Sequence, residues 1–303
     1  MSFSAVCRAA EEYQRLAKAP FAFLFRDLGT GETVHYHGDE PFPTASSFKV
    51  FILAALYRKA ALGELSLDDR LPLRDEYKAL GSGVLSALGE GLAPTLKDLA
   101  LLMMMISDNT ATDMLFDLVG KDCIREQVIE PLGLTRTRCD LPCKELIDKS
   151  YELEGRTIEE MFAAYGGQPS YRNNPYYTCE AEENDQSSPL DMLKMYETLY
   201  RGEWVNAATS DAMLDVLKQC QTNSRIPYEL PPFTTVAHKT GTLDRLAVDT
   251  GIVYTQKGDY FLAMFYNGNL AGEADYDADP AGHASDRFLA SCSGAVYRAY
   301  MEE

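Results

Sequence analysis

Short apolar runs of the kind that form β-strands lie at both ends of this chain. Two of them, residues 21–27 and 32–37, flank turn residues, so we expect a hairpin there. Three more runs, rich in valine, isoleucine, tyrosine and phenylalanine, cover residues 234–238, 246–255 and 260–267. A Gln-Lys-Gly-Asp turn joins the last two runs. These five segments predict one antiparallel sheet built from both ends of the chain.

Between the two sets of strands the hydrophobic pattern is helical. Residues 50–57 are apolar all round, which is typical of a helix buried on every side. Apolar residues also recur at helical spacing over 96–106, 110–119, 189–200 and 210–220. Two further helices are expected near the termini, over residues 4–18 and 284–300.

The order of these elements predicts an α+β fold made of an α/β lobe and an all-α lobe. The sheet lobe would consist of residues 1–45 and 223–303, flanked by the terminal helices. An all-helical lobe, residues 46–222, would be inserted between its strands. We expect the active site in the cleft between the two lobes. Residues 165–188 lose the helical period and predict a long loop, and long ordered loops tend to be functional.

Composition narrows the class of partner. The 303 residues carry a formal net charge of -18, which would repel nucleic acids and anionic membranes. The longest apolar runs are far shorter than the roughly 18 residues that cross a bilayer. The first residues have the pattern of an amphipathic helix and not of a secretory signal. We therefore expect a monomer that acts on a small molecule, cytoplasmic if the sequence is full length and otherwise a secreted or periplasmic mature form.

The sequence predicts no disulfide framework, no metal site and no cofactor. Seven scattered cysteines are better explained as free thiols. His35 and His37 share a strand face but have no evident third ligand, so exposed strand histidines are the better interpretation. The acidic run at residues 275–279 resembles a calcium loop, but Pro280 replaces the required glycine and no glutamate closes it. We expect a solvated acidic loop there.

The candidate chemistry begins with Ser46 and Lys49, at the start of the buried helix. Residues three apart share a helix face, so the two side chains can meet. A lysine there is costly to desolvate unless it has a partner or a task. The positive helix N-terminus disfavours the charge of the lysine, which suits a base that takes the serine proton. The alternative is a serine that caps the helix and a lysine that extends to water.

Two more motifs follow along the chain. Ser107-Asp108-Asn109 lies between two predicted helices, and Lys239-Thr240-Gly241-Thr242 follows the apolar residues of a predicted strand. Each motif alone is weak, and the first could simply cap a helix. Together with Ser-x-x-Lys, in this order, they form the signature of class A β-lactamases and penicillin-binding proteins.

The chain resembles the class A β-lactamase family and its relatives in the penicillin-recognising DD-peptidase/β-lactamase superfamily of serine hydrolases. The resemblance runs from about Phe21 to Asn267 and includes the opening hairpin with its Asp-Leu-Gly-Thr-Gly-Glu turn. It implies that Ser46 is acylated, that Lys49 takes its proton and that Ser107 passes a proton to the leaving nitrogen. It implies the same superfamily fold that the strand and helix order predicts.

The resemblance also implies how substrate is bound. The backbone N–H groups of Ser46 and Thr242 would form the oxyanion hole. Asn109 would hold an amide of the substrate. The third motif would form a cationic, hydroxyl-lined seat for a substrate carboxylate, with Lys239 as a catalytic residue that also keeps Lys49 neutral. The seat consists of Lys239, Thr240, Gly241 and Thr242.

One element of the family's pattern is missing. Its lactamases carry a glutamate, in a Glu-x-x-Leu-Asn context on the long loop, that activates water for deacylation. Residues 165–188 contain no such context, and spacing places none of Glu180, Glu182 and Glu183 beside Ser46. We therefore expect a serine hydrolase that attacks a β-lactam or a related amide or ester. The alternative is a penicillin-binding or sensing module, or a peptidase or esterase, that is acylated but deacylates slowly.

Overall fold

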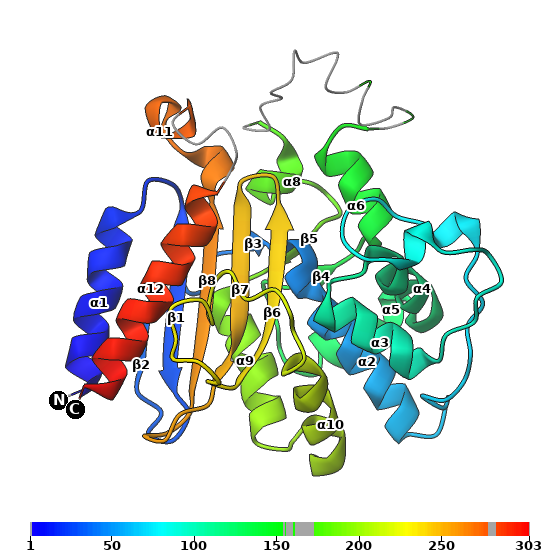
Figure 1. Cartoon of the computed structure of the whole chain (residues 1–303), viewed down its shortest axis with the longest axis horizontal. Helices are drawn as coiled ribbons and strands as arrows, with labels where there is room; N and C mark the ends of the chain where they lie inside the picture. The colour runs from blue at the N-terminus through cyan, green and yellow to red at the C-terminus, as the bar shows by residue number, and fades with distance from the viewer. Residues whose placement is uncertain (1, 154, 156–159, 161–172, 278–282, 303) are drawn as a thin grey trace.

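The computed structural model describes residues 2–153, 155, 160, 173–277 and 283–302, and its main sheet joins the two ends of the chain (Figure 1). Its five antiparallel strands lie in the order β2-β1-β8-β7-β6. Their bounds are Phe21–Asp27 (β1), Thr33–Tyr36 (β2), Val236–Leu243 (β6), Leu246–Val253 (β7) and Tyr260–Asn267 (β8). The predicted sheet is therefore present, with β6 as the edge strand that carries the third motif.

The alternation of side chains along β1 explains how the sheet is covered on both faces. Phe21, Phe23 and Phe25 enter one apolar cluster, while Ala22 and Leu24 enter another, because successive side chains of a strand point to opposite faces. The first cluster is closed by α1 (Ser2–Leu16) and α12 (Ala284–Met301), which lie side by side in Figure 1. Residues at both ends of the chain thus enclose one core.

The second cluster extends from the other face of the sheet into the helical part of the molecule. Its centre is α2 (Lys49–Ala61), in which every residue from Lys49 to Tyr57 is buried. The helices around it begin at polar caps: Thr95 and Asp98 form a capping box on α3, and Asp108 caps α4. The remaining helices are α3 (Leu96–Met105), α4 (Asn109–Val119), α5 (Lys121–Ile124), α6 (Cys143–Ser150), α8 (Pro175–Thr178), α9 (Pro189–Tyr200), α10 (Ala207–Leu217) and α11 (Glu273–Asp277).

A small second sheet lies between the two parts and was not predicted. It consists of β3 (Phe42–Pro43), β5 (Asp185–Ser187) and β4 (Arg138–Cys139), in that order. The prediction that residues 46–222 are all helical is therefore wrong at two short strands, which are too short to carry a recognisable period of two. This sheet fixes the chain just before Ser46, because Thr44 donates to Asp185 O from its backbone N–H and its hydroxyl, at 3.0 and 2.9 Å.

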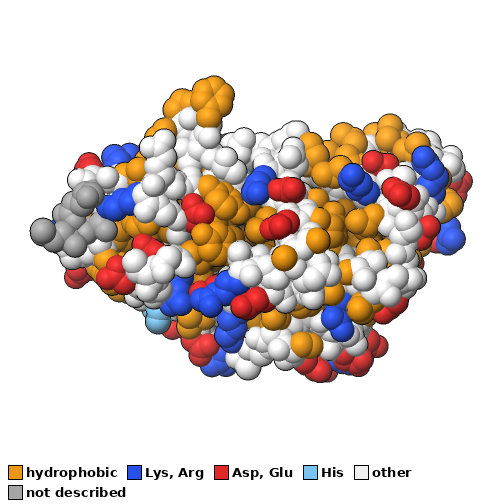
Figure 2. Space-filling view, turned by 90° about the horizontal axis from the view of Figure 1, so that it is seen from below, with side chains coloured by type: hydrophobic (Ala, Val, Ile, Leu, Met, Phe, Trp, Pro, Cys, Tyr) orange, Lys and Arg blue, Asp and Glu red, His pale blue; other side chains and the backbone are white. Residues whose placement is uncertain are grey.

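The structure also bears on the predictions for membrane helices, metal sites, histidines, cysteines and the two loops. The described residues contain no helix that is long and apolar enough to cross a membrane, and no metal-binding group of three acidic, histidine or cysteine residues. His37 pairs with Glu40 at 2.8 Å on the surface, and all seven cysteines are free. Most of the predicted long loop, and Asp279 of the acidic run, lie outside the described residues. On the face in Figure 2, acidic and basic side chains are interspersed with apolar ones.

Candidate active site

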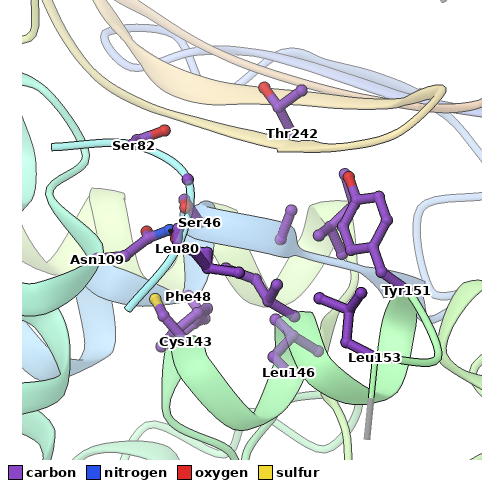
Figure 3. A pocket seen from close by; sticks show the side chains of 14 residues that line it. Ser46, Phe48, Leu80, Ser82, Asn109, Cys143, Leu146, Tyr151, Leu153 and Thr242 are labelled. Atoms are coloured by element: carbon purple, nitrogen blue, oxygen red, sulfur yellow. Dashed lines mark hydrogen bonds between the residues drawn. The ribbon is translucent and has the colours of Figure 1, made fainter. Parts of the chain in front are cut away.

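Ser46 lies in the wall of a cavity of about 370 Å³ at the start of α2. It belongs to a 3₁₀ turn, Ala45–Phe48, and is half-buried between buried neighbours. Its hydroxyl makes no hydrogen bond to any residue that the structure describes, and it faces the cavity beside Asn109 in Figure 3. The cavity is lined by Ala45, Ser46, Phe48, Leu80, Gly81, Ser82, Asn109, Cys143, Leu146, Ile147, Tyr151, Leu153, Thr242 and Leu243.

The backbone around Ser46 is strained and closely packed. Ala45 has a φ of 43° and Ser107 a φ of 57°, a left-handed conformation that costs free energy in residues with a side chain. Strand β6 approaches this turn so closely that a Cβ on Gly241 would lie 2.1 Å from Thr44 O. Glycine at position 241 therefore lets the third motif reach the turn that carries the predicted nucleophile.

Lys49 is completely buried, and its ammonium group is directed at the second motif. Its Nζ donates to Ser107 O at 2.8 Å, to Asn109 Oδ1 at 2.8 Å and to Ser107 Oγ at 3.1 Å. These three bonds occupy all three donors, so the expected hydrogen bond between Lys49 and Ser46 is not formed. Burial lowers the pKa of Lys49 below its usual value. The uncharged amine, which can act as a base, is thereby favoured.

Lys239 reaches the same hydroxyl from strand β6. It is completely buried, and its Nζ donates to Ser107 Oγ at 3.1 Å and to Thr240 O at 2.7 Å. Burial, opposed in part by the nearby Cys220, lowers the pKa of Lys239 to about 7. Two lysines from distant parts of the sequence thus meet at the hydroxyl of Ser107, and not at the hydroxyl of Ser46, where the motifs predicted the meeting point.

The other two residues of the second motif hold the cavity rim in place. Asp108 caps α4 by accepting from Ala111 N at 2.9 Å, and it also accepts from Val84 N and Leu85 N at 2.7 and 3.0 Å. Asn109 donates from Nδ2 to Leu80 O at 2.7 Å while its Oδ1 accepts from Lys49. The second N–H of the Asn109 amide has no partner among the described residues, and its predicted role in holding a substrate amide stays a prediction.

Of the third motif, Thr242 lies on the opposite wall of the cavity (Figure 3), whereas Lys239, Thr240 and Gly241 are not among its lining residues. Thr240 is buried and Thr242 is exposed, and both stand on the edge strand β6. A buried arginine that the motifs did not indicate supports them: Arg225 donates to Thr242 Oγ1 at 2.6 Å and to Gly241 O at 2.7 Å. Asp286 accepts from the same guanidinium at 2.8 Å. Arg225 sits in an irregular segment, so no periodic pattern could have marked it.

Comparison with known proteins places this chain in a family. A family profile described as "Beta-lactamase enzyme family" matches residues 8–300. The chain belongs to that family. Beta-lactamase L2 of Stenotrophomonas maltophilia is 32% identical over 45% of this chain, which spans 46% of that relative's length. The chain thus spans about half the length of that curated relative.

Solved structures of similar proteins have the same fold. A beta-lactamase from Sphaerobacter thermophilus superposes with a TM-score of 0.78 at 29% identity, over 99% of this chain and 98% of that one. A structure of PBP-A superposes with a TM-score of 0.75 at 24% identity, over 98% and 97% of the two chains. The predicted family resemblance and fold class are confirmed.

In this member of the beta-lactamase enzyme family, the floor of the cavity is formed by α6, which sequence reasoning missed. Asp113 holds the start of α6 by accepting from Cys143 N at 2.6 Å and Lys144 N at 2.9 Å. Burial raises the pKa of Asp113 to about 6. The helix presents Cys143, Leu146 and Ile147 to the cavity. The spacing of these apolar residues by three and four positions, with charged residues between and after them, was the available signal.

The glutamates considered from the sequence do not reach the cavity. Glu183 pairs with Lys121 at 2.8 Å, Glu180 accepts from the Thr178 hydroxyl at 3.0 Å, and Glu182 is exposed. Among the described residues that line the cavity, none carries a carboxylate. The cavity side of α6 offers the Cys143 thiol, and burial raises the pKa of that thiol to about 12.

Proposed function

We propose that this protein is a serine hydrolase in which Ser46 attacks the carbonyl of a β-lactam, or of a related amide or ester, to form an acyl-enzyme. The observation that carries the proposal is the meeting of Lys49 and Lys239 at Ser107 Oγ, two residues before Asn109, which lines the cavity that contains Ser46. Burying two ammonium groups costs considerable desolvation free energy, and a non-catalytic role would not explain why both are buried here.

The proposed acylation uses Lys49 as the base. Burial favours its neutral amine, which can turn from Ser107 to the Ser46 hydroxyl and take its proton. The serine oxygen then bonds to the substrate carbonyl carbon, and the C–N or C–O bond of the substrate breaks. Ser107 Oγ, 3.1 Å from Lys49 Nζ, returns a proton to the leaving atom. The net result is one ester bond formed and one amide or ester bond broken.

Substrate binding is proposed to use the opposite wall. The backbone N–H groups of Ser46 and Thr242 would stabilise the oxyanion. A carboxylate of the substrate would lie against the hydroxyls of Thr240 and Thr242 and be attracted by the charge of Lys239. Thr242 Oγ1 accepts from Arg225, so its own proton is available to donate to that carboxylate.

The remaining part of the cavity favours an apolar acyl group on the substrate. Leu80, Leu146, Ile147 and Leu153 line it, and Tyr151 stands beside Leu153 in Figure 3. Apolar walls of this kind stabilise a bound hydrocarbon or aromatic group by about 25 cal/mol per Å² of surface removed from water. We therefore propose substrates whose acyl side chain is hydrophobic.

Slow deacylation is the second candidate behaviour, and one observation favours it. No described cavity-lining residue offers a carboxylate to activate water, and Leu146 and Cys143 occupy the floor instead. A protein with this site would act as a penicillin-binding or sensing module, or as a peptidase or esterase with little turnover of β-lactams.

A fluorescent penicillin tests the proposed acylation. We expect the wild type to be labelled and Ser46→Ala to remain unlabelled. Ser82→Ala is the matched control, because Ser82 lines the same cavity but is exposed at its rim, and it should be labelled like the wild type. Equal labelling of the wild type and Ser46→Ala would overturn the proposal.

A further inference from the structure

A second cluster of reactive side chains lies on the opposite face of β6 from Lys239. His238 directly precedes Lys239, so its side chain leaves the other face of the strand. Its Nδ1 is 2.9 Å from Asp249 Oδ1 on the neighbouring strand β7. Cys220, just after α10, lines the same cavity as His238, and the imidazole and the thiol influence each other's pKa. Cysteine, histidine and aspartate, the residue types of a nucleophilic triad, are thus grouped at one place.

The fold around this cluster is built to hold it. Asp249 is completely buried, and its second oxygen accepts from Ile226 N at 2.9 Å, which fixes the carboxylate. Opposite His238 on β7 stands Gly251, where a Cβ would lie 2.4 Å from His238 Cβ. Glycine at this position leaves the room that the imidazole occupies.

The cluster opens on a cavity of about 560 Å³ that is separate from the one containing Ser46. Cys220 and His238 both line it, and the segment 227–236 forms its rim. Two aromatic side chains of that rim, Tyr228 and Phe233, are exposed by 70% and 102%. The thiol is largely buried at the floor, and the opening gives small molecules access to it.

The charges around Cys220 favour its ionised form. Burial works against a charged imidazole, but the Asp249 carboxylate outweighs it and raises the pKa of His238 to about 10. Burial likewise raises the pKa of the Cys220 thiol, but the hydrogen bond and charge of His238 bring it below its usual value. Lys239 on β6 lowers it further, and Asp249 on β7 opposes this. Burial and, to a lesser degree, the charges of Asp249 and Cys220 raise the pKa of Tyr196 on α9.

We propose that Cys220, His238 and Asp249 form a second nucleophilic site, in which the Cys220 thiolate is modified by small disulfides and carbon electrophiles. With a disulfide, the thiolate sulfur bonds to one sulfur of the reagent and the original S–S bond breaks. The displaced thiolate leaves with the bonding electrons and takes its proton from water. The disulfide is itself the oxidant, so the step balances without another reagent.

Modification of Cys220 would also change the rate of acylation at Ser46. This consequence rests on the proposed function. The charge of Cys220 raises the pKa of Lys239, against the lowering by burial. Removing that charge by a mixed disulfide would leave Lys239 less protonated near neutral pH. We therefore expect a modified protein to be acylated more slowly by carboxylate-bearing substrates.

Alkylation by iodoacetamide, followed by peptide mass analysis, tests the site on the whole chain. Half-buried Cys123 is the internal control. We expect Cys220 to react about tenfold faster than Cys123 near pH 6, because a paired thiolate persists where an ordinary thiol is protonated. His238→Gln should remove this advantage. A Cys220 rate no higher than that of Cys123, or one that His238→Gln leaves unchanged, would overturn the proposal.

The pH dependence of the alkylation rate in the wild type also tests whether Cys220 is a thiolate, without the need for a variant. The rate at Cys220 should rise less steeply between about pH 6 and pH 8 than the rate at Cys123, because an ordinary thiol gains reactivity about tenfold per pH unit in this range. An equally steep rise at Cys220 and Cys123 would contradict the thiolate pair. Labelling of Ser46 by penicillin is measured separately, so failure of one site does not imply failure of the other.

Discussion

Lys49 Nζ and Lys239 Nζ lie at the same distance, 3.1 Å, from one oxygen atom, Ser107 Oγ. Both lysines are completely buried, so each makes it harder for the other to carry a charge. The Ser107 hydroxyl can accept from both amines and still has one proton to donate. It is therefore the one group in the described site that can exchange a proton with either lysine.

Removal of this hydroxyl should slow acylation without unfolding the protein. For Ser107→Ala we expect the acylation rate to fall by about 10²–10⁴-fold, the usual contribution of a positioned proton donor. Ser107→Thr, which restores a hydroxyl, should recover part of the rate. Stopped-flow measurement with a chromogenic β-lactam gives both values, and a wild-type rate in Ser107→Ala would show that the proton takes another path.

Acylation by substrates with a carboxylate should weaken as the pH rises through about 7, the pKa of Lys239. Below that pH Lys239 is charged and attracts the carboxylate, and above it the attraction is lost. Titration of Lys49 affects acidic and neutral substrates alike, so the ratio of their acylation rates isolates Lys239. We expect the ratio of a penicillin to an uncharged ester to fall between about pH 6 and pH 8. A constant ratio would show that Lys239 does not contribute to binding of the carboxylate.

A methyl group at Gly241 should damage both stability and acylation. The added Cβ would lie 2.1 Å from Thr44 O, so β6 or the turn before Ser46 must move. We expect Gly241→Ala to lower the free energy of unfolding by about 1–3 kcal/mol, as overpacking does, and to slow labelling of Ser46. Gly89→Ala, where nothing lies within 4 Å of the new Cβ, is the control. Equal stability of the two variants would contradict the close approach.

A carboxylate on the cavity floor should shorten the lifetime of the acyl-enzyme. Cys143 lines the cavity and contacts Lys49, so Cys143→Glu places an acid beside the amine and near the ester carbonyl. We expect faster loss of bound penicillin, because the carboxylate can activate water. Leu153→Glu, on the outer wall, should not have this effect. The lifetimes follow from the decay of the acylated mass after excess penicillin is removed.

The apolar wall should select for the acyl group of the substrate. In a series of activated esters, acylation should become faster from acetyl to hexanoyl as more hydrocarbon is buried, by up to about 0.8 kcal/mol per methylene. Leu146→Asn should flatten this dependence while leaving the acetyl ester almost unchanged. A dependence that is flat in the wild type, or the same in both proteins, would place the acyl chain elsewhere.

The sequence predicted the elements that have strong periodicity or a recognisable motif. The apolar run after Lys49 and the β-rich segments near the C-terminus led directly to α2 and the sheet. The strands around Asp185 and Cys139 were missed because two or three residues carry no period. The division into lobes at residues 46 and 222 stays a prediction.

The candidate site was predictable to the extent that it is encoded in contiguous motifs. Ser107 and Lys239 could be identified because each belongs to a short contiguous motif. The structure brings them together with Lys49. Arg225 and Asp113 act through tertiary contacts to backbone groups far away in the sequence. Such contacts depend on how segments pack, which no local pattern records. The roles proposed for Ser46 and its partners stay predictions until they are measured.

The central claim concerns one covalent bond, so the mass of the intact protein tests it most directly. After exposure to benzylpenicillin, the wild type should gain the mass of one penicillin molecule, which persists if deacylation is slow and is lost as the antibiotic is consumed if deacylation is fast, while Ser46→Ala should gain nothing. An unmodified wild type at every time, with no consumption of the antibiotic, would contradict the account, as would an adduct that persists in Ser46→Ala.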